Sequence, residues 1–71
     1  MPSERHNLTV EEWQVHLGKQ VRAARLAVDL DQATVAERAD VSTGAVKNLE
    51  GGKGSSLKTL IRVLRVLDRT D

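Results

Sequence analysis

The 71-residue sequence predicts a small all-α domain, a compact bundle of four helices or five. Two observations support this fold class. Apolar residues recur at three- and four-residue steps in four segments, which is the periodicity of amphipathic helices. A Ser, Thr or Asp stands at the start of each segment, where such side chains cap a helix. A chain of this length buries only about 60% of its unfolded surface, so burial against a partner would add stability.

The first helix is expected to begin near residue 10 and to run to about residue 28. Thr9 and Glu12 have the spacing of a capping box, and Leu8 and Trp13 are placed to form a hydrophobic staple around it. We expect an apolar stripe on this helix, Trp13 included, to pack against the helices that follow. Residues 1–8 then form a flexible N-terminal segment, and the domain spans residues 9–71. The stripe consists of Val10, Trp13, Leu17, Val21 and Ala24.

Residues 31–50 predict two short helices joined by a tight turn, with Asp31 and Ser42 as their N-caps. In the second helix, small and polar residues fall opposite the apolar ones. Such a surface can approach base edges closely and offers them hydrogen-bonding groups and a cation. The helix dipole also favours a phosphate at the N-terminus. This pattern therefore indicates a helix-turn-helix that binds DNA in the major groove. The residues of the polar surface are Thr43, Gly44, Lys47 and Asn48.

The segment after this motif is a loop rich in glycine and serine, at residues 51–56, that carries Lys53. Backbone N–H groups of such a loop can approach phosphates, and Lys53 adds a point charge. Residues 1–41 hold five basic and seven acidic groups, net −2, whereas residues 42–71 hold six basic and three acidic groups, net +3. The positive charge thus lies in the second motif helix and beyond it, a field that can orient the protein on a polyanion.

The last helix is expected over residues 57–67, with apolar positions that cover an arc of roughly 220°, about twice what one core-facing stripe needs. The centre of the arc should face the core, and its flanks should form a second surface. Because exposed apolar patches usually mark interfaces, we expect these flanks to form a dimer contact. The predicted core positions are Leu60, Val63, Leu64 and Leu67. The predicted dimer contacts are Leu57, Ile61 and Val66.

A set of residues in a characteristic order and spacing extends from residue 17 to residue 67. They are Leu17-Gly18, Val21-Arg22, Arg25, Leu30-Asp31-Gln32, Val35-Ala36, Val41-Ser42, Val46, Leu49-Glu50, Gly52, Leu60, Val63-Leu64 and Leu67. In the order and spacing of these residues, the chain resembles the Xre, or Cro/repressor-like (lambda repressor-like), family of helix-turn-helix DNA-binding regulators. Asp29 and Asp40 stand where relatives usually carry glycine, and both positions are expected to need a left-handed backbone, which Asp tolerates better than most residues.

The resemblance implies roles for several residues. By position, Gln32 and Ser42 would hold DNA phosphates, and Thr43 with Gly44 would read bases. Gly44 supplies no side chain, so base reading would fall to the next turn of the helix. The residues of that turn are Lys47 and Asn48.

Two further roles follow from the same resemblance. Lys53 takes the place of the basic residue that often contacts phosphate from this loop. The family also pairs an Arg in its opening helix with a Glu that closes the second motif helix. In this chain the pair is Arg25 and Glu50, and its expected role is structural, not DNA reading.

The leading functional hypothesis is a sequence-specific transcriptional regulator of double-stranded DNA, most simply a homodimeric repressor of a near-palindromic operator. The alternative is an antitoxin-type protein that holds a toxin and autoregulates their shared promoter. Catalysis finds little support, because His6 and His16 lack a third ligand at metal spacing and the chain has no Cys. We therefore expect no enzyme activity, catalytic residue, metal site or cofactor.

The sequence also predicts a location. It has no cysteine, no apolar signal segment and no stretch near the roughly 20 apolar residues that span a bilayer. We expect a cytoplasmic, nucleoid-associated protein, bacterial or phage-encoded, with no membrane partner.

Overall fold

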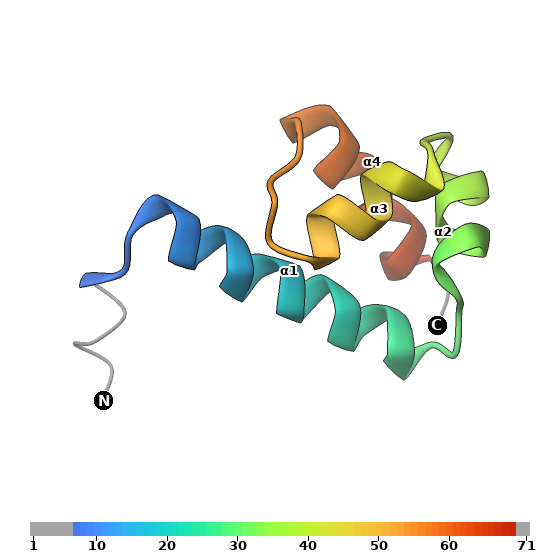
Figure 1. The fold of residues 1–71 in the computed structure, drawn as a ribbon. Coiled ribbons are helices and arrows are strands. Elements are labelled where there is room, and N and C mark those ends of the chain that lie inside the picture. Colours follow the sequence, from blue (N-terminus) through green and yellow to red (C-terminus); the bar gives the residue numbers. More distant parts are fainter. Residues whose placement is uncertain (1–6, 70–71) are drawn as a thin grey trace.

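The computed structural model describes residues 7–69, and within them the chain forms four helices and no strand. Figure 1 shows α1 along one side of the molecule, α3 lying across it, α2 at the C-terminal end of α1, and α4 behind. The predicted all-α fold is confirmed, with four helices in the described residues. Most of the predicted N-terminal segment, residues 1–6, lies outside them. The helices are α1 (Val10–Ala27), α2 (Gln32–Ala39), α3 (Thr43–Glu50) and α4 (Leu57–Asp68).

Each helix begins where the sequence predicts a cap. In every case the cap side chain accepts a hydrogen bond from the backbone N–H three residues later, which satisfies a donor that the helix itself leaves unpaired. Glu12 completes the predicted capping box, because its Oε1 accepts from the backbone N–H of Thr9 at 2.9 Å. The cap bonds are 3.1 Å at Thr9, 2.7 Å at Asp31, 3.0 Å at Ser42 and 3.1 Å at Ser56.

The hydrophobic core lies between α2, α3 and α4, and the C-terminal half of α1 covers one side of it. Val35, Val46 and Val63 are fully buried, one from each of the three core helices. Val21 is the buried large apolar residue of α1. Full burial of a valine side chain contributes about 1.5–3 kcal/mol. These four valines therefore hold α2 and α3 in place relative to each other and to the helices around them.

Gly18 allows α1 to pass close to the end of α3. A Cβ placed on Gly18 would lie 2.8 Å from the carbonyl oxygen of Glu50 and closer still to that of Leu49. Both obstacles are backbone atoms, which cannot rotate away as a side chain can. Only glycine therefore permits this crossing, which sets the position of α3 on α1.

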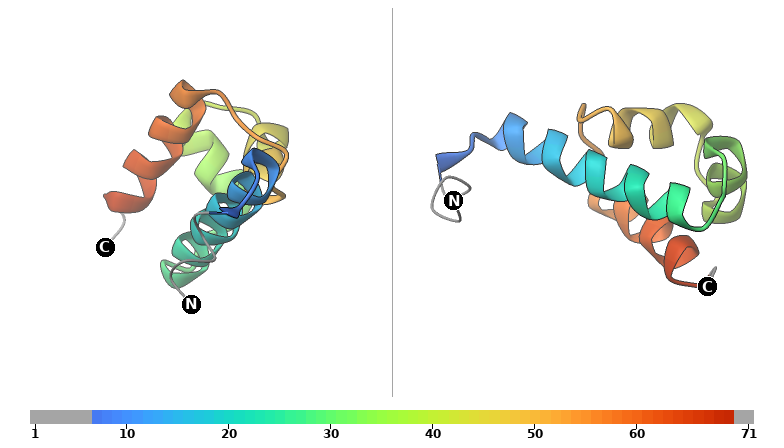
Figure 2. Two further views of the ribbon diagram at one scale, coloured as in Figure 1. Left: turned by 90° about the vertical axis from the view of Figure 1, so that its left-hand side faces the viewer. Right: turned by 90° about the horizontal axis from the view of Figure 1, so that it is seen from below.

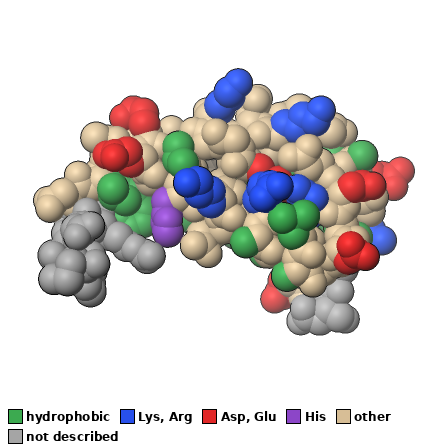
Figure 3. Space-filling view, turned by 60° about the horizontal axis from the view of Figure 1, so that its bottom comes forward, with side chains coloured by type: hydrophobic (Ala, Val, Ile, Leu, Met, Phe, Trp, Pro, Cys, Tyr) green, Lys and Arg blue, Asp and Glu red, His purple; other side chains and the backbone are tan. Residues whose placement is uncertain are grey.

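The N-terminal half of α1 extends beyond the other three helices (Figures 1 and 2). The expected packing of its apolar stripe is therefore wrong except at Val21. Val10, Trp13 and Leu17 are 70%, 38% and 46% exposed, and Trp13 meets His16 edge to face, with ring centroids 5.5 Å apart. Figure 3 shows hydrophobic side chains on the surface over this half of the helix. The periodicity identified an apolar face correctly, but no described element covers it.

The core-facing side of α4 also differs from the expectation. Val66 is 8% exposed, so it belongs to the core and cannot contribute to a dimer surface, whereas Leu64, expected in the core, is 46% exposed. The reason is that α2 packs against α4, and the buried side of α4 carries Val63 and Val66. Leu57, Ile61 and Leu64 lie on one exposed side of the helix, and we call these three residues the α4 stripe.

Two turns have the left-handed backbone that the sequence predicts. Asp29, in the link before α2, and Asp40, at the C-terminus of α2, both have a φ of 57°. Asp40 is the C-cap of α2, and its backbone N–H returns to the carbonyl oxygens of Ala36 and Glu37. Because this conformation costs a residue other than glycine about 1–2 kcal/mol, both turns carry strain.

Candidate nucleic-acid interface

The N-terminus of α3 presents a small, polar surface to solvent. Ser42 is exposed, and its Oγ accepts from the backbone N–H of Ala45 at 3.0 Å. A hydroxyl also has one proton to donate, which the cap bond does not use, so Ser42 can donate to a phosphate while it caps the helix. Thr43 is half-buried beside it. The geometry suits an anion at this helix end.

Gly44 leaves the backbone of α3 bare at its first turn. It is exposed, and the nearest atom to a Cβ placed there would be Ser42 Oγ at 3.8 Å, an ordinary contact. Packing within the chain therefore does not require glycine at this position. The effect of Gly44 is on the outer surface, where it allows close approach to a ligand.

Lys47 and Asn48 lie one turn further along α3. Both are exposed, while Val46 and Leu49 on the opposite side of the helix are buried. With Gly44 they share one face, since their spacing of three and four residues is one helical turn. The structure thus brings the predicted base-reading residues together on one solvent-facing surface of α3.

The loop after α3 folds back on that helix and places Lys53 beside it. The backbone N–H of Lys53 donates to the carbonyl oxygen of Asn48 at 2.9 Å, and the Lys53 side chain is exposed. Gly52 and Gly54 have positive φ angles of 78° and 93°. A Cβ on Gly52 would clash with Val15 of α1, so the loop is seated against α1 as well. The turn that carries the exposed Lys53 side chain is therefore held in position by α1 and α3.

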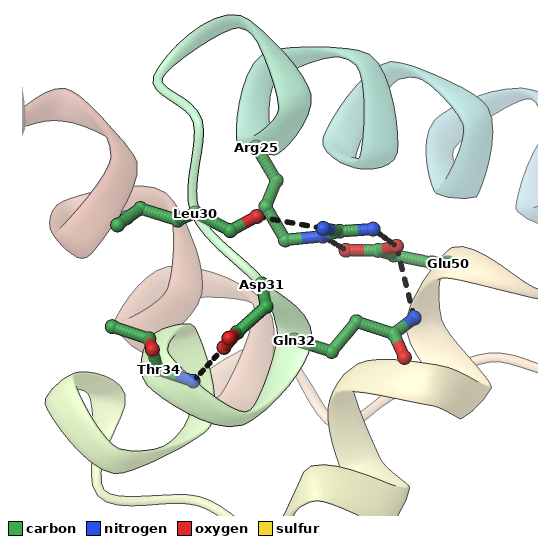
Figure 4. Close-up of polar contacts among 6 residues, drawn as sticks. All are labelled: Arg25, Leu30, Asp31, Gln32, Thr34 and Glu50. Carbon is green, nitrogen blue, oxygen red and sulfur yellow. Dashed lines mark hydrogen bonds and ion pairs between the residues drawn. The ribbon is translucent and has the colours of Figure 1, made fainter.

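A buried ion pair joins Arg25 of α1 to Glu50 at the C-terminal end of α3 (Figure 4). Arg25 Nε donates to Glu50 Oε2 at 2.7 Å, and Arg25 Nη2 donates to Glu50 Oε1 at 2.9 Å. The two side chains are only 9% and 3% exposed. The hydrogen bonds to Glu50 raise the pKa of Arg25 further above its ordinary value. The predicted partners thus form a bidentate ion pair, the arrangement that gives the strongest hydrogen bonding between Arg and a carboxylate.

Gln32, the predicted phosphate contact on α2, is half-buried and bonded to the same carboxylate. Its Nε2 donates to Glu50 Oε1 at 3.1 Å. Sequence reasoning did not foresee this contact, because the two residues are 18 positions apart and no local pattern links them. Asp31, next to Gln32, caps α2, and the backbone N–H of Thr34 lowers the pKa of its carboxyl group.

Neither a metal-binding cluster nor a membrane-spanning helix is found among residues 7–69. No group of three or more His, Cys, Asp or Glu residues there could hold a metal ion. No helix among residues 7–69 has the length and apolarity to cross a membrane.

A family model described as helix-turn-helix matches residues 21–71, which is more than half of the chain and includes α2, α3 and α4. Comparison with curated proteins and with solved structures gives no match.

Proposed function

Since the chain belongs to the Xre/Cro-repressor-like helix-turn-helix family of DNA-binding transcriptional regulators, we propose that it acts as a homodimeric repressor that occludes a near-palindromic operator. The observation that carries the proposal is the exposed polar face of α3, with its capped N-terminus and bare first turn, on a helix whose C-terminal end is fixed by a buried ion pair. A helix of this kind enters the major groove by its N-terminal end.

Contacts to the DNA divide into two kinds. Ser42, Gln32 and Lys53 surround α3 and hold phosphates, which position the helix without reading sequence. Lys47 and Asn48 reach base edges, since Lys pairs with guanine and Asn with adenine in the major groove. The backbone at Gly44 lies closest to the base pairs, because no side chain separates it from them.

The α4 stripe supports the homodimer. Ile61 and Leu64 line an open groove of about 620 Å³ between α4 and α1, with Ala24 on the α1 side. Leu57 continues the apolar surface toward the start of α4 and is 71% exposed. A second copy that covers this surface by two-fold symmetry removes it from water and adds the burial that a small domain lacks.

Dimer formation is tested by Ile61→Asp, with Leu26→Asp as matched control. The two residues are 48% and 49% exposed, but Leu26 lies on α1 outside the α4 stripe. In sedimentation, we expect the parent protein and Leu26→Asp to be dimers and Ile61→Asp to be a monomer of unchanged helical content. On a full operator, only Ile61→Asp should bind more weakly. A monomeric parent at high micromolar concentration, with half-sites bound as tightly as full sites, would contradict the dimer.

An antitoxin-type role is the second candidate, and the exposed face of α1 favours it. Val10, Trp13 and Leu17 form an apolar surface separate from the α4 stripe, and a dimer through α4 leaves it uncovered. A partner toxin would bury this surface while α3 stays free for DNA. Co-expression with the product of a neighbouring gene tests the idea. A complex that Trp13→Glu abolishes, without loss of DNA binding, supports it, and a complex insensitive to Trp13 and Leu17 contradicts it.

A further inference from the structure

Gln32 is held by a carboxylate that lies almost wholly inside the protein. We propose that Glu50 is a positioning residue for DNA binding, because its carboxylate, neutralised by Arg25, orients the Gln32 side chain for a phosphate at the start of α2. This inference rests on the proposed DNA contact of Gln32. It gives the Arg25 and Glu50 ion pair a role beyond stability.

The geometry fixes which end of the Gln32 amide faces Glu50. An ionised carboxylate only accepts hydrogen bonds, so the NH2 group, and not the carbonyl oxygen, must point toward it. Glu50 Oε1 accepts from Gln32 Nε2 at 3.1 Å and from Arg25 Nη2 at 2.9 Å. The amide therefore keeps its second N–H for an acceptor outside the protein. Figure 4 shows Gln32 reaching from the start of α2 to Glu50 at the end of α3.

Arg25 makes this arrangement compatible with a nearby phosphate. A lone carboxylate beside the DNA backbone would repel it, whereas the paired charges of Arg25 and Glu50 sum to zero. Arg25 also holds the backbone that leads into α2, because its Nη1 donates to the carbonyl oxygen of Leu30 at 2.7 Å. The same ion pair thus fixes both the chain before Gln32 and the end of its side chain.

The consequence for binding is entropic. A free glutamine side chain samples many rotamers, and a DNA contact must restrict them at an unfavourable free energy. In this protein the restriction occurs during folding, so the side chain is preorganised before DNA arrives. Glu50 therefore raises DNA affinity without touching DNA, and it does so equally for every base sequence.

The first test measures the motion of the Gln32 side-chain NH2 group in the free protein by ¹⁵N relaxation. Gln20, exposed on α1, is the internal control. We expect the side-chain amide of Gln32 to have a clearly higher order parameter than that of Gln20, because only Gln32 is held by a hydrogen bond inside the protein. Equal mobility of the two amides would overturn the proposal. This measurement needs no variant, so it remains decisive if changes at Glu50 prevent folding.

The second test is a double-mutant cycle on DNA affinity with Gln32→Ala, Glu50→Gln and the double variant, measured by fluorescence anisotropy on one duplex. We expect Glu50→Gln to weaken binding about three- to tenfold more in the parent than in the Gln32→Ala background, where its remaining effect reflects only the unpaired charge of Arg25. An equal loss in both backgrounds would overturn the positioning role. If the parent itself binds no duplex, the proposed function fails instead, and the two failures remain distinct.

Discussion

Arg25 of α1 and Glu50 at the end of α3 are 25 residues apart in sequence and are joined by two hydrogen bonds inside the protein. Arg25→Ala strands the Glu50 carboxylate at a buried position, which costs about 3–5 kcal/mol. For a domain of this size each kcal/mol lowers Tm by roughly 4–8 °C, so the variant should melt at least about 12 °C below the parent. Arg22→Ala, exposed on the same helix, is the control and should change stability by less than about 0.5 kcal/mol. An unchanged Tm for Arg25→Ala would show that the pair does not stabilise the fold.

Asp40 carries strain that glycine would relieve. Its φ of 57° disfavours any residue with a Cβ, and its carboxylate lies at the negative C-terminal end of α2. The ion pair that opposes this effect is weak, since Arg62 Nη1 lies 3.9 Å from Asp40 Oδ2 and the Asp40 side chain is 97% exposed. The hydrogen bond from Arg62 Nη1 to the Asp40 carbonyl oxygen does not depend on the carboxylate. We expect Asp40→Gly to raise the free energy of unfolding by about 0.5–1 kcal/mol. Asp40→Ala removes the same charge but keeps the strain, so in urea titrations it should be less stable than Asp40→Gly. The reverse order would contradict the role of the backbone.

The Asp31 carboxyl group should make the free energy of unfolding depend on pH in the acid range. The backbone N–H of Thr34 lowers the pKa of its carboxyl group in the folded protein below the ordinary value of 3.8. The unfolded chain therefore binds a proton at Asp31 more readily than the folded one. The stabilisation that this carboxylate gives to the fold is complete above its ordinary pKa, and it is lost as pH falls through the lowered pKa. Asp31→Asn keeps a capping oxygen but does not titrate. The difference in unfolding free energy between parent and variant should thus be constant near neutral pH and shift against the parent below about pH 4. A difference that stays constant into the acid range would contradict the cap assignment.

Local signals predicted the backbone of this protein well. Caps at Thr9, Asp31, Ser42 and Ser56, and left-handed turns at Asp29 and Asp40, depend on residues within a few positions of each other. Local patterns carry this information because cap bonds and turn conformations are decided within one helical turn.

Tertiary contacts were harder to predict. Periodicity showed that Trp13 and Leu64 lie on apolar faces, but it does not say which other helix covers a face. The contact between Gln32 and Glu50 depends on how α2 crosses α3, which is a property of the packed core. The exposed face of α3 and the Arg25 and Glu50 pair could therefore be predicted from sequence, whereas the hydrogen bond between Gln32 and Glu50 could not.

Lys53 should contribute to affinity without reading sequence. Its side chain is exposed on a turn that is fixed against α1 and α3, where a phosphate contact releases a counterion from DNA. Removing it by Lys53→Ala should lower the slope of log K against log salt by about one unit while the preferred site stays the same. Lys19→Ala, an exposed lysine on α1, is the control. An unchanged slope with an altered preferred site would contradict the assignment.

Lys47 and Asn48 should instead alter base preference. They share the exposed face of α3 with Gly44, which has no side chain to offer. Each base contact is expected to contribute about 1–3 kcal/mol of discrimination, so Lys47→Ala and Asn48→Ala should each relax one position of the site. Affinity measured on single-base variants of the preferred duplex checks this. If each variant weakens every duplex equally, the two side chains contact phosphates.

The most direct measurement is selection of bound duplexes from a random DNA pool, followed by titration of the selected site and a shuffled control at physiological salt. We predict one near-palindromic site, with half-site centres about 10 base pairs apart, bound at least about 10³-fold more tightly than the control. A pool without an enriched sequence, or equal affinity for both duplexes, would contradict sequence-specific recognition by α3.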